Sequence, residues 1–421
     1  MGKLVNFCAG AEWKKRPDNV KAILINAPVN GSSKRRIEKA KLLRQDTQPN
    51  YLMVDSGGFQ LLDAEKKKWK ITHDPARPLI YRPQEINLAA KHVFEFASLL
   101  KPDIGFGLDF PVDKFKTAAE REIEFFKKLP LNLRFAHESA RWKRKLCPEI
   151  QLFQPIQAYN LRHLDIFLDQ TAGIPYDGVA IPIREAKFYE IAIFLTSFYQ
   201  RGISQIHLLG TASFLKIAMV AFMTHDLFNW VSLDSATWVK SAVRCVFLNP
   251  RNLKQIDLRR TVKLDPGMVN DCKCSYCCSR SFIKIQNLPN KEKFEMLRQH
   301  NWHAIDNAVA DLWANSSNLP QLERFLKHRD IKSAEIDNLI NTLALVDCLK
   351  DDNIEVLHDI LTPVPKKRKS SRRSRKQTIF DLQPRKPTKK SRQPSVSAFR
   401  LTAVPDMQVK LEQIKKVLQE D

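Results

Sequence analysis

The sequence predicts an α/β fold, and within that class a (β/α)8 barrel of the TIM type with additions on its C-terminal side. Eight short, mostly apolar runs precede residue 240, and such runs are typical of strands buried on both faces of a parallel sheet. Stretches of helical pattern separate the later runs, as crossovers between parallel strands require. The length of 421 residues, 43% of them hydrophobic, suits one barrel with additions.

The expected strands are four or five residues long, and in chain order they are Leu4–Phe7, Ala22–Asn26, Tyr51–Val54, Ile104–Leu108, Leu152–Ile156, Gly178–Ile181, Ile206–Leu209 and Trp230–Leu233. The expected helices between the later strands are Thr117–Leu129, Leu161–Thr171, Glu185–Tyr199 and Thr211–Leu227. The same alternation also fits a doubly wound open sheet, which is the structural alternative.

Four parts are expected along the chain: the barrel at 1–255, a metal-binding subdomain at 256–303, a helical region at 304–362 and a basic, mostly disordered tail at 363–421. Within the tail, Lys366–Arg400 contains 14 Lys and Arg residues and one acid, Asp381. The run is also rich in Ser, Pro and Gln. A segment of this composition buries too little apolar surface to offset the entropy of ordering it.

The formal net charge of +23 indicates a polyanionic partner, and nucleic acid is the expected one. No apolar run reaches the roughly 18–20 residues of a membrane span, and the N-terminal residues lack the pattern of a signal peptide. No membrane partner is therefore expected. Four of the eight cysteines lie within 272–278. This clustering favours reduced thiols at a metal, and hence an intracellular protein, cytoplasmic or, in a eukaryotic host, nuclear.

Polar residues follow four of the apolar runs at the point where each run ends. Asp-Ser-Gly-Gly-Phe-Gln at 55–60 follows the third run, Asp109 the fourth, Gln157 the fifth and Asp234 the eighth. In a parallel barrel these positions open onto one face, where active sites are built. Clustered carboxylates there suit acid/base chemistry, and paired glycines let backbone approach a ligand. Helix N-capping is the alternative role for each single Asp.

The cysteine cluster predicts a zinc site. Cys272, Cys274 and Cys277 have the spacing Cys-x-Cys-x2-Cys, and 22 residues separate Cys277 from His300. Three thiolates and one imidazole complete a tetrahedral shell, so we expect one structural zinc per chain. Cys278 is a second candidate thiolate, and His303 lies about one helical turn beyond His300. Cysteines without a metal are the remaining alternative.

Taken together, these motifs resemble the tRNA-guanine transglycosylase family. The match spans roughly 20–310 and rests on 55–60, on Ile-His-Leu-Leu-Gly-Thr at 206–211, on the segment 228–236 around Asp234, and on the Cys/His pattern with the pair His300-Asn301. The resemblance implies a zinc-containing (β/α)8 enzyme that exchanges guanine in a nucleic acid for a 7-deazaguanine base.

The resemblance also implies a role for each candidate residue. Asp234 would attack C1′ of the target nucleotide and form a covalent intermediate, and Asp55 would act as general acid/base. Asp109 would hydrogen-bond the purine edge, and Gln157 would hold the base from another strand. The expected catalytic residues are Asp234 and Asp55, and the expected substrate-binding residues are Asp109, Gln157, Ser56, Gly57, Gly58, Phe59 and Gln60.

Two departures from the family pattern bear on the substrate. Gln157-Ala158-Tyr159 stands where the family has Gln-Gly-Gly, and Ala-Ile-Pro-Ile at 180–183 stands where it has a glycine pair. Pro182 has no N–H to offer a base. With the basic tail and no recognisable tRNA-binding domain, these departures favour the DpdA-like DNA-guanine transglycosylases, with partner proteins for access to DNA. tRNA is the alternative substrate, and a catalytically inert nucleic-acid-binding relative is the alternative function.

Overall fold

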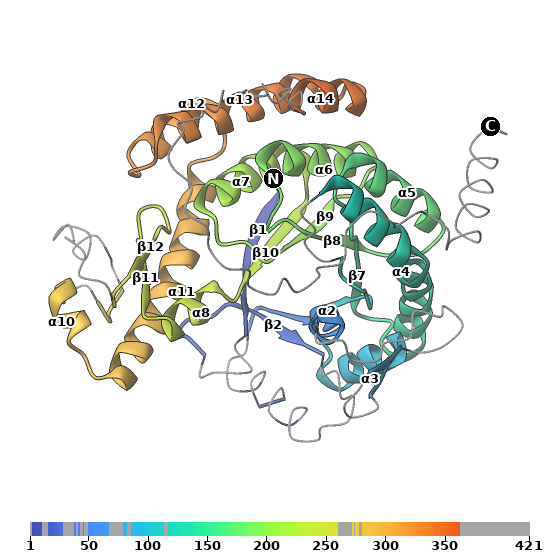
Figure 1. Ribbon diagram of the computed structural model, residues 1–421, viewed down its shortest axis with the longest axis horizontal. Helices are drawn as coiled ribbons and strands as arrows, with labels where there is room; N and C mark the ends of the chain where they lie inside the picture. The colour runs from blue at the N-terminus through green and yellow to red at the C-terminus, as the bar shows by residue number, and fades with distance from the viewer. Residues whose placement is uncertain are drawn as a thin grey trace, which may run out of the picture. The chain divides into compact units, whose positions relative to one another are not determined.

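Eight parallel strands close into a barrel in the computed structural model of the protein (Figure 1). The structure describes residues 2–10, 16–27, 49–66, 79–81, 86–112, 117–259, 272, 274–277 and 280–362, with helical positions at 38, 41, 42 and 45. Residues 1–364 form one compact unit. The predicted tail at 363–421, with its basic run Lys366–Arg400, lies outside the described residues, as does Cys278.

The barrel strands are β1 (Lys3–Ala9), β2 (Ala22–Asn26), β3 (Tyr51–Asp55), β6 (Ile104–Phe106), β7 (Gln151–Pro155), β8 (Gly178–Pro182), β9 (Gln205–Leu209) and β10 (Trp230–Ser235). Their order around the ring is β1-β10-β9-β8-β7-β6-β3-β2. The ring closes where β1 pairs with β2, with Cys8 opposite Ile23. The barrel prediction is thereby confirmed, and the open sheet is excluded.

Helices surround the strands as crossovers (Figure 1). They are α2 (Gly58–Lys66), α3 (Ala90–Leu100), α4 (Ala118–Leu146), α5 (Leu161–Thr171), α6 (Phe188–Gln200), α7 (Phe214–Leu227) and α8 (Thr237–Val243). The expected helix at 161–171 has the expected bounds. Helices α6 and α7 each begin three residues later than expected, because their first expected residues belong to the loops after β8 and β9.

Helix α4 is much longer than the expected helix that ended at Leu129. A Thr117 side chain caps its N-terminus with Glu120 in a capping box. Pro130 lies inside the helix, where it removes one backbone donor. Buried side chains on both sides of Pro130, among them Phe125 and Phe135, pack into the core and hold the two halves in line.

The barrel interior is a packed core. The side chains that fill it come from alternate positions of the strands and are Val5, Phe7, Ala9, Ala22, Leu24, Met53, Ile104, Phe106, Phe153 and Ala180. This period of two follows from strand geometry. It also places Asp55 on the inner side of β3, in step with Met53. Two polar residues, His207 and Ser232, are fully buried within this apolar set.

The segments after β10 extend the barrel on one side. They are the antiparallel pair β11 (Val246–Leu248) and β12 (Gln255–Asp257), then α10 (Phe282–Gln286), α11 (Asn290–Ala314), α12 (Leu319–Lys327), α13 (Ser333–Leu349) and α14 (Ile354–Leu361). A second antiparallel pair, β4 (Leu79–Tyr81) with β5 (Ile86–Leu88), lies between β3 and α3.

Helix α11 packs against α7, α8, β1 and β11, and α13 and α14 pack on α6 (Figure 1). The Asn301 side chain of α11 accepts from the Leu248 amide at 2.9 Å and donates to the Val246 carbonyl at 3.0 Å. Because α11 extends from Asn290 to Ala314, it crosses the boundary expected at residue 303 between the metal-binding subdomain and the helical region. No helix among the described residues is long and apolar enough to cross a membrane.

Candidate active site and metal centre

The candidate catalytic and binding residues stand at the C-terminal ends of four barrel strands. Asp55 ends β3, Asp234 is the last residue but one of β10, and Asp109 and Gln157 lie just beyond β6 and β7. Because all eight strands are parallel, these residues share one mouth of the barrel. Hydrogen bonds among the described residues form two groups at this mouth, one around Asp109 and one around Asp234.

The first group is centred on Asp109, which is only 6% exposed. Its Oδ1 accepts from Ser56 Oγ at 2.7 Å, and its Oδ2 accepts from Gln157 Nε2 at 2.7 Å. Burial raises the pKa of Asp109 from 3.8 to about 6, although both of these hydrogen bonds and the charge of Lys128 act to lower it. The site therefore holds a carboxyl group that changes charge near neutral pH.

The glycine pair makes this group possible. A Cβ on Gly58 would lie 2.3 Å from Asp109 Oδ1 and 2.6 Å from the Asp109 carbonyl oxygen, which no side chain tolerates. Gly57 has φ +78° and packs on the carbonyl oxygen of Ala27, at the end of β2. The Gly58 amide donates to Ser56 Oγ at 3.1 Å, so the turn also orients the hydroxyl that binds Asp109.

Side chains of helix α4 hydrogen-bond to the backbone of the loop after β6. Its Asn132 side chain accepts from the Phe110 amide at 2.7 Å and donates to the Phe110 carbonyl at 3.1 Å. Lys128, fully buried, donates to the Pro111 carbonyl at 2.8 Å and pairs with Glu124 at 2.8 Å. Sequence reasoning missed Asn132 because the expected helix stopped at Leu129, and it assigned Lys128 and Glu124, which lie inside that helix, no role. Their polar side chains on an otherwise apolar helix face were the available signal.

The second group is centred on Asp234. Its Oδ1 accepts from the Gly210 amide at 2.8 Å and lies 3.2 Å from His207 Nε2. His207 Nδ1 in turn lies 2.7 Å from Ser232 Oγ. Gly210 has φ +78°, a conformation that favours glycine. The resemblance had marked the strand end that contains His207 and Gly210, but sequence reasoning assigned neither residue a role.

The remaining motif residues lie around the same mouth. Phe59 is 64% exposed, so its ring is free to contact a ligand. Gln60 Nε2 donates to the Ala27 carbonyl oxygen at 3.2 Å, which ties the motif to the end of β2. The Ala27 amide donates to the Asp55 carbonyl oxygen at 2.8 Å, which holds the ends of β2 and β3 together. Tyr159 Oη donates to the Val112 carbonyl oxygen at 2.6 Å.

The metal ligands predicted from the sequence come together in the structure. One donor atom from each of Cys272, Cys274, Cys277 and His300 lies within 4.8 Å of the others, and all four residues are buried. His300 Nδ1 is 3.3, 3.6 and 3.2 Å from the three sulfurs in chain order. His303 instead places Nε2 2.8 Å from Asn307 Nδ2. Among the described residues, the choice of His300 is confirmed.

The chemistry of this cluster fits a structural zinc ion. His300 Nε2 donates to the Leu248 carbonyl at 2.8 Å, which leaves Nδ1 as the ligand atom and fixes the ring. Hydrogen bonds from Cys272 and Cys274, and then burial, raise the pKa of Cys277 far above its ordinary value. A bound cation would offset this and favour the thiolate forms of all three cysteines. With four protein ligands the shell is closed, as in structural zinc sites.

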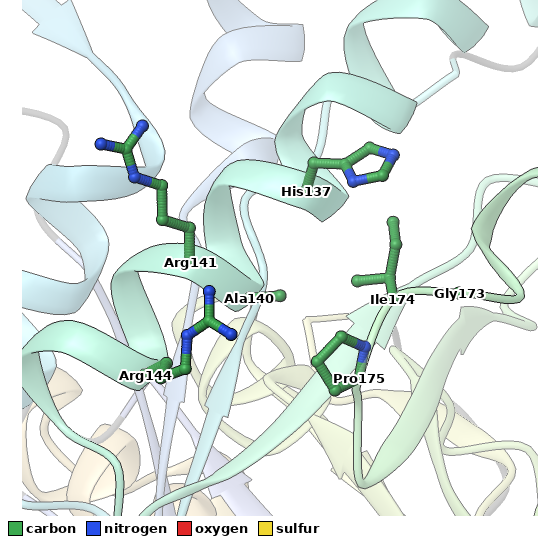
Figure 2. Close-up of a pocket in the computed structure, with 7 residues that line it drawn as sticks. All are labelled: His137, Ala140, Arg141, Arg144, Gly173, Ile174 and Pro175. Atoms are coloured by element: carbon green, nitrogen blue, oxygen red, sulfur yellow. The ribbon is translucent and has the colours of Figure 1, made fainter.

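A pocket of about 250 Å³ lies elsewhere on the barrel. His137, Ala140 and Arg144 of α4 face Ile174 and Pro175 across it (Figure 2). Arg144 precedes β7 and Pro175 precedes β8, so the pocket lies near the N-terminal ends of these strands. It is therefore on the face opposite Asp55, Asp109 and Asp234, and it takes no part in their chemistry.

Comparison with known proteins agrees with this geometry. Residues 19–314 match the family model described as queuine tRNA-ribosyltransferase, and this segment contains all the candidate residues at the mouth and the Cys/His cluster. Three similar proteins are each named tRNA-guanine(15) transglycosylase. They come from Methanobrevibacter smithii (24% identical over 59% of this chain and 34% of the relative), Methanosphaera stadtmanae (23%, 61% and 33%) and Pyrococcus abyssi (23%, 64% and 40%). The matched segment thus spans a third to two fifths of these longer relatives.

Proposed function

Because the chain belongs to the queuine tRNA-ribosyltransferase family, we propose that it is a guanine transglycosylase acting on nucleic acid. It would replace a guanine base by another purine-like base, of the 7-deazaguanine class, without cutting the polynucleotide. The observation that carries the proposal is the shared mouth of Asp55, Asp109, Gln157 and Asp234 within the matched segment.

In this proposal Asp234 is the nucleophile. One carboxylate oxygen forms a bond to C1′ of the target nucleotide, and the bond from C1′ to N9 of guanine breaks with its electron pair moving to the base. The incoming base then attacks C1′ through its own N9, and the carboxylate leaves. The position of Asp234 supports this role. It is the last inward-facing residue of β10, and its side chain is 12% exposed at the C-terminal mouth of the barrel.

Asp55 is proposed as the general acid/base. It would donate a proton to the departing guanine and accept the N9 proton of the incoming base, so the two half-reactions return it to its starting state. Two features support the assignment. Asp55 lies on the inner side of β3 at the same mouth, and it is partly exposed, as a group that meets substrate must be.

Asp109 and Gln157 are proposed to read the base. The N1–H and exocyclic amino group of guanine are donors, and an ionised carboxylate is an acceptor only, so Asp109 suits that edge. Gln157 offers both a donor and an acceptor from the neighbouring strand. The exposed ring of Phe59 is proposed to stack on the base, which must first leave its helix or stem at a cost of a few kcal/mol.

The zinc ion, when bound, holds the 272–277 loop to α11 and takes no part in base exchange. Cys272, Cys274, Cys277 and His300 would be its ligands. His300 Nε2 donates a hydrogen bond to the Leu248 carbonyl oxygen of β11, so the site also connects β11 to α11. Because α11 packs on β1 and α8, the site would stabilise the barrel wall beside Asp234.

tRNA is the better supported substrate. The similar relatives are named for tRNA, whereas the basic tail that favoured DNA serves either polymer equally well. The substrate test is incubation of the purified chain with labelled guanine and, in separate reactions, unmodified tRNA, duplex DNA and single-stranded DNA. We expect label in tRNA. Label in DNA alone would assign the chain to the DNA-modifying branch.

An Asp234→Asn variant distinguishes an enzyme from an inert relative. It should incorporate no label and form no covalent adduct on a denaturing gel, because an amide is not a nucleophile of comparable strength. Asp226→Asn is the matched control, since Asp226 is an exposed residue of α7 that forms an ion pair with Lys350 at 3.9 Å. Absence of label in all polymers with the unaltered chain would refute the enzyme proposal and favour a binding role.

A further inference from the structure

We propose that His207 is a positioning residue for Asp234, and that Ser232 in turn fixes His207. The inference rests on the proposed function, because it assigns a supporting role at the proposed nucleophile. The three side chains form a chain of hydrogen bonds inside the barrel, from Ser232 Oγ to His207 Nδ1 at 2.7 Å and from His207 Nε2 to Asp234 Oδ1 at 3.2 Å.

The strand register places the three residues together. Ser232 of β10 lies directly opposite His207 of β9, and Asp234 follows Ser232 by two residues on the same face. The imidazole is fully buried, and its centroid is 5.0 Å from that of Phe106 and 6.1 Å from that of Phe7. These rings leave the imidazole little room to rotate away from Asp234.

In the hydrogen bond between His207 and Asp234, the chemistry of Asp234 determines which group donates. A carboxylate only accepts, so Nε2 carries a hydrogen and donates to Asp234. Ser232 can donate or accept, so its hydroxyl satisfies Nδ1 in either protonation state of the ring. A buried polar group needs such a partner. A histidine that only filled space in this apolar core would gain nothing over leucine.

The consequence for Asp234 is that its two oxygens become unequal. Within the described part of the chain, both hydrogen bonds of the carboxylate end on Oδ1, one from His207 and one from the Gly210 amide. Two donors on one oxygen hold the plane of the carboxylate, and Oδ2 is left to form the bond to C1′. The same two donors stabilise the charge on the carboxylate when the incoming base displaces it.

The kinetic test compares His207→Leu, His207→Gln and Ser232→Ala with the unaltered chain. His207→Leu removes the donor and should lower kcat about ten- to hundredfold, the usual effect of a hydrogen bond to a charged group, with KM for the nucleic acid within about threefold. His207→Gln keeps an N–H donor and should recover most of the lost rate. Ser232→Ala should show a smaller loss, and it keeps the proposal testable if His207→Leu does not fold.

His225→Gln is the matched control, because His225 is stacked on Trp313 and donates to its carbonyl oxygen at 3.0 Å, away from the mouth. It should leave kcat unchanged. A second readout does not depend on activity. In spectra of the chain with ¹⁵N-labelled histidine, the His207 signal should carry its proton on Nε2 and should shift in Asp234→Asn but not in Asp226→Asn.

These readouts separate the two proposals. If the unaltered chain exchanges guanine and His207→Leu keeps its kcat, the positioning role is wrong. If the chain labels no nucleic acid but the His207 signal still responds to Asp234→Asn, the pairing stands and the transglycosylase proposal is wrong. A His207 signal without a proton on Nε2 overturns the pairing whatever the activity.

Discussion

Asp109 should make the protein less stable as the pH rises. Its pKa is about 6 in the folded protein against 3.8 for an ordinary Asp, the value expected in the unfolded chain, so the folded state binds this proton more tightly than the unfolded state does. The resulting stability is fully present below pH 3.8 and is lost as the pH rises through 6. A difference of about two pKa units corresponds to about 3 kcal/mol, of which about half falls between pH 5 and pH 8.

The assay is urea unfolding of the unaltered chain and of Asp109→Asn at pH 5, 6, 7 and 8. The variant has no charge to bury, and either Ser56 or Gln157 can accept from the new NH2 group while the other still donates to the amide oxygen. The free energy of unfolding of the variant minus that of the unaltered chain should therefore rise by about 1–2 kcal/mol from pH 5 to pH 8. Taking this difference cancels the titration of other carboxyl groups and of the zinc ligands.

Asp226→Asn serves as the control, since it removes the same charge at an exposed site. The change with pH for Asp109→Asn should exceed that for Asp226→Asn by about 1–2 kcal/mol. Equal changes would refute the reasoning, because they would mean that Asp109 is ionised without penalty. The same titration should appear in catalysis. If Asp109 must be ionised to accept from guanine, kcat/KM should fall below about pH 6 on the acid side.

Three further outcomes are expected. His300→Ala should lose bound zinc, measured by metal analysis, and unfold at a lower temperature, while His303→Ala should keep about one zinc per chain; the reverse result would mean that the ligand was misassigned. Gly58→Ala should abolish base exchange yet leave the chain folded by circular dichroism, because the added Cβ displaces Asp109, and full activity would contradict the contact described. Deletion of Lys366–Arg400 should weaken nucleic-acid binding and flatten its salt dependence by about 0.7–0.9 per lost phosphate contact, and an unchanged slope would show that the run is only a linker.

The barrel could be predicted from sequence because each strand is buried on both sides. Such strands appear as short, mostly apolar runs, and Ala22–Asn26 matches β2 residue for residue. Strand ends were harder to place, since β6 ends at Phe106 although the apolar run continues to Leu108. The zinc ligands were predictable for a different reason: three of the four are close in sequence, so local spacing carries most of the information.

The hydrogen-bond partners of the candidate site could not be predicted, because they depend on register and on packing between distant segments. A single histidine in an apolar run does not show that Ser232 stands opposite it on the next strand. The contacts of the polar α4 residues near Asp109 could not be predicted for the same reason. Pro130 added a second difficulty, because it hid the continuation of the helix. A proline is read as the end of a helix, yet here the helix continues because its side chains are anchored in the core on both sides of it.

The two groups at the mouth are built for different tasks. Asp109 has one hydrogen bond on each oxygen, from Ser56 and from Gln157, and each oxygen keeps a second lone pair that can accept from a purine. Asp234 has both of its hydrogen bonds on Oδ1, and the described residues leave Oδ2 without one. In the proposed reaction this difference matters, because a guanine edge offers two neighbouring donors whereas C1′ needs only one attacking oxygen. Asp109 is held evenly, so both of its oxygens suit recognition, and Asp234 is held through one oxygen, so the other suits attack.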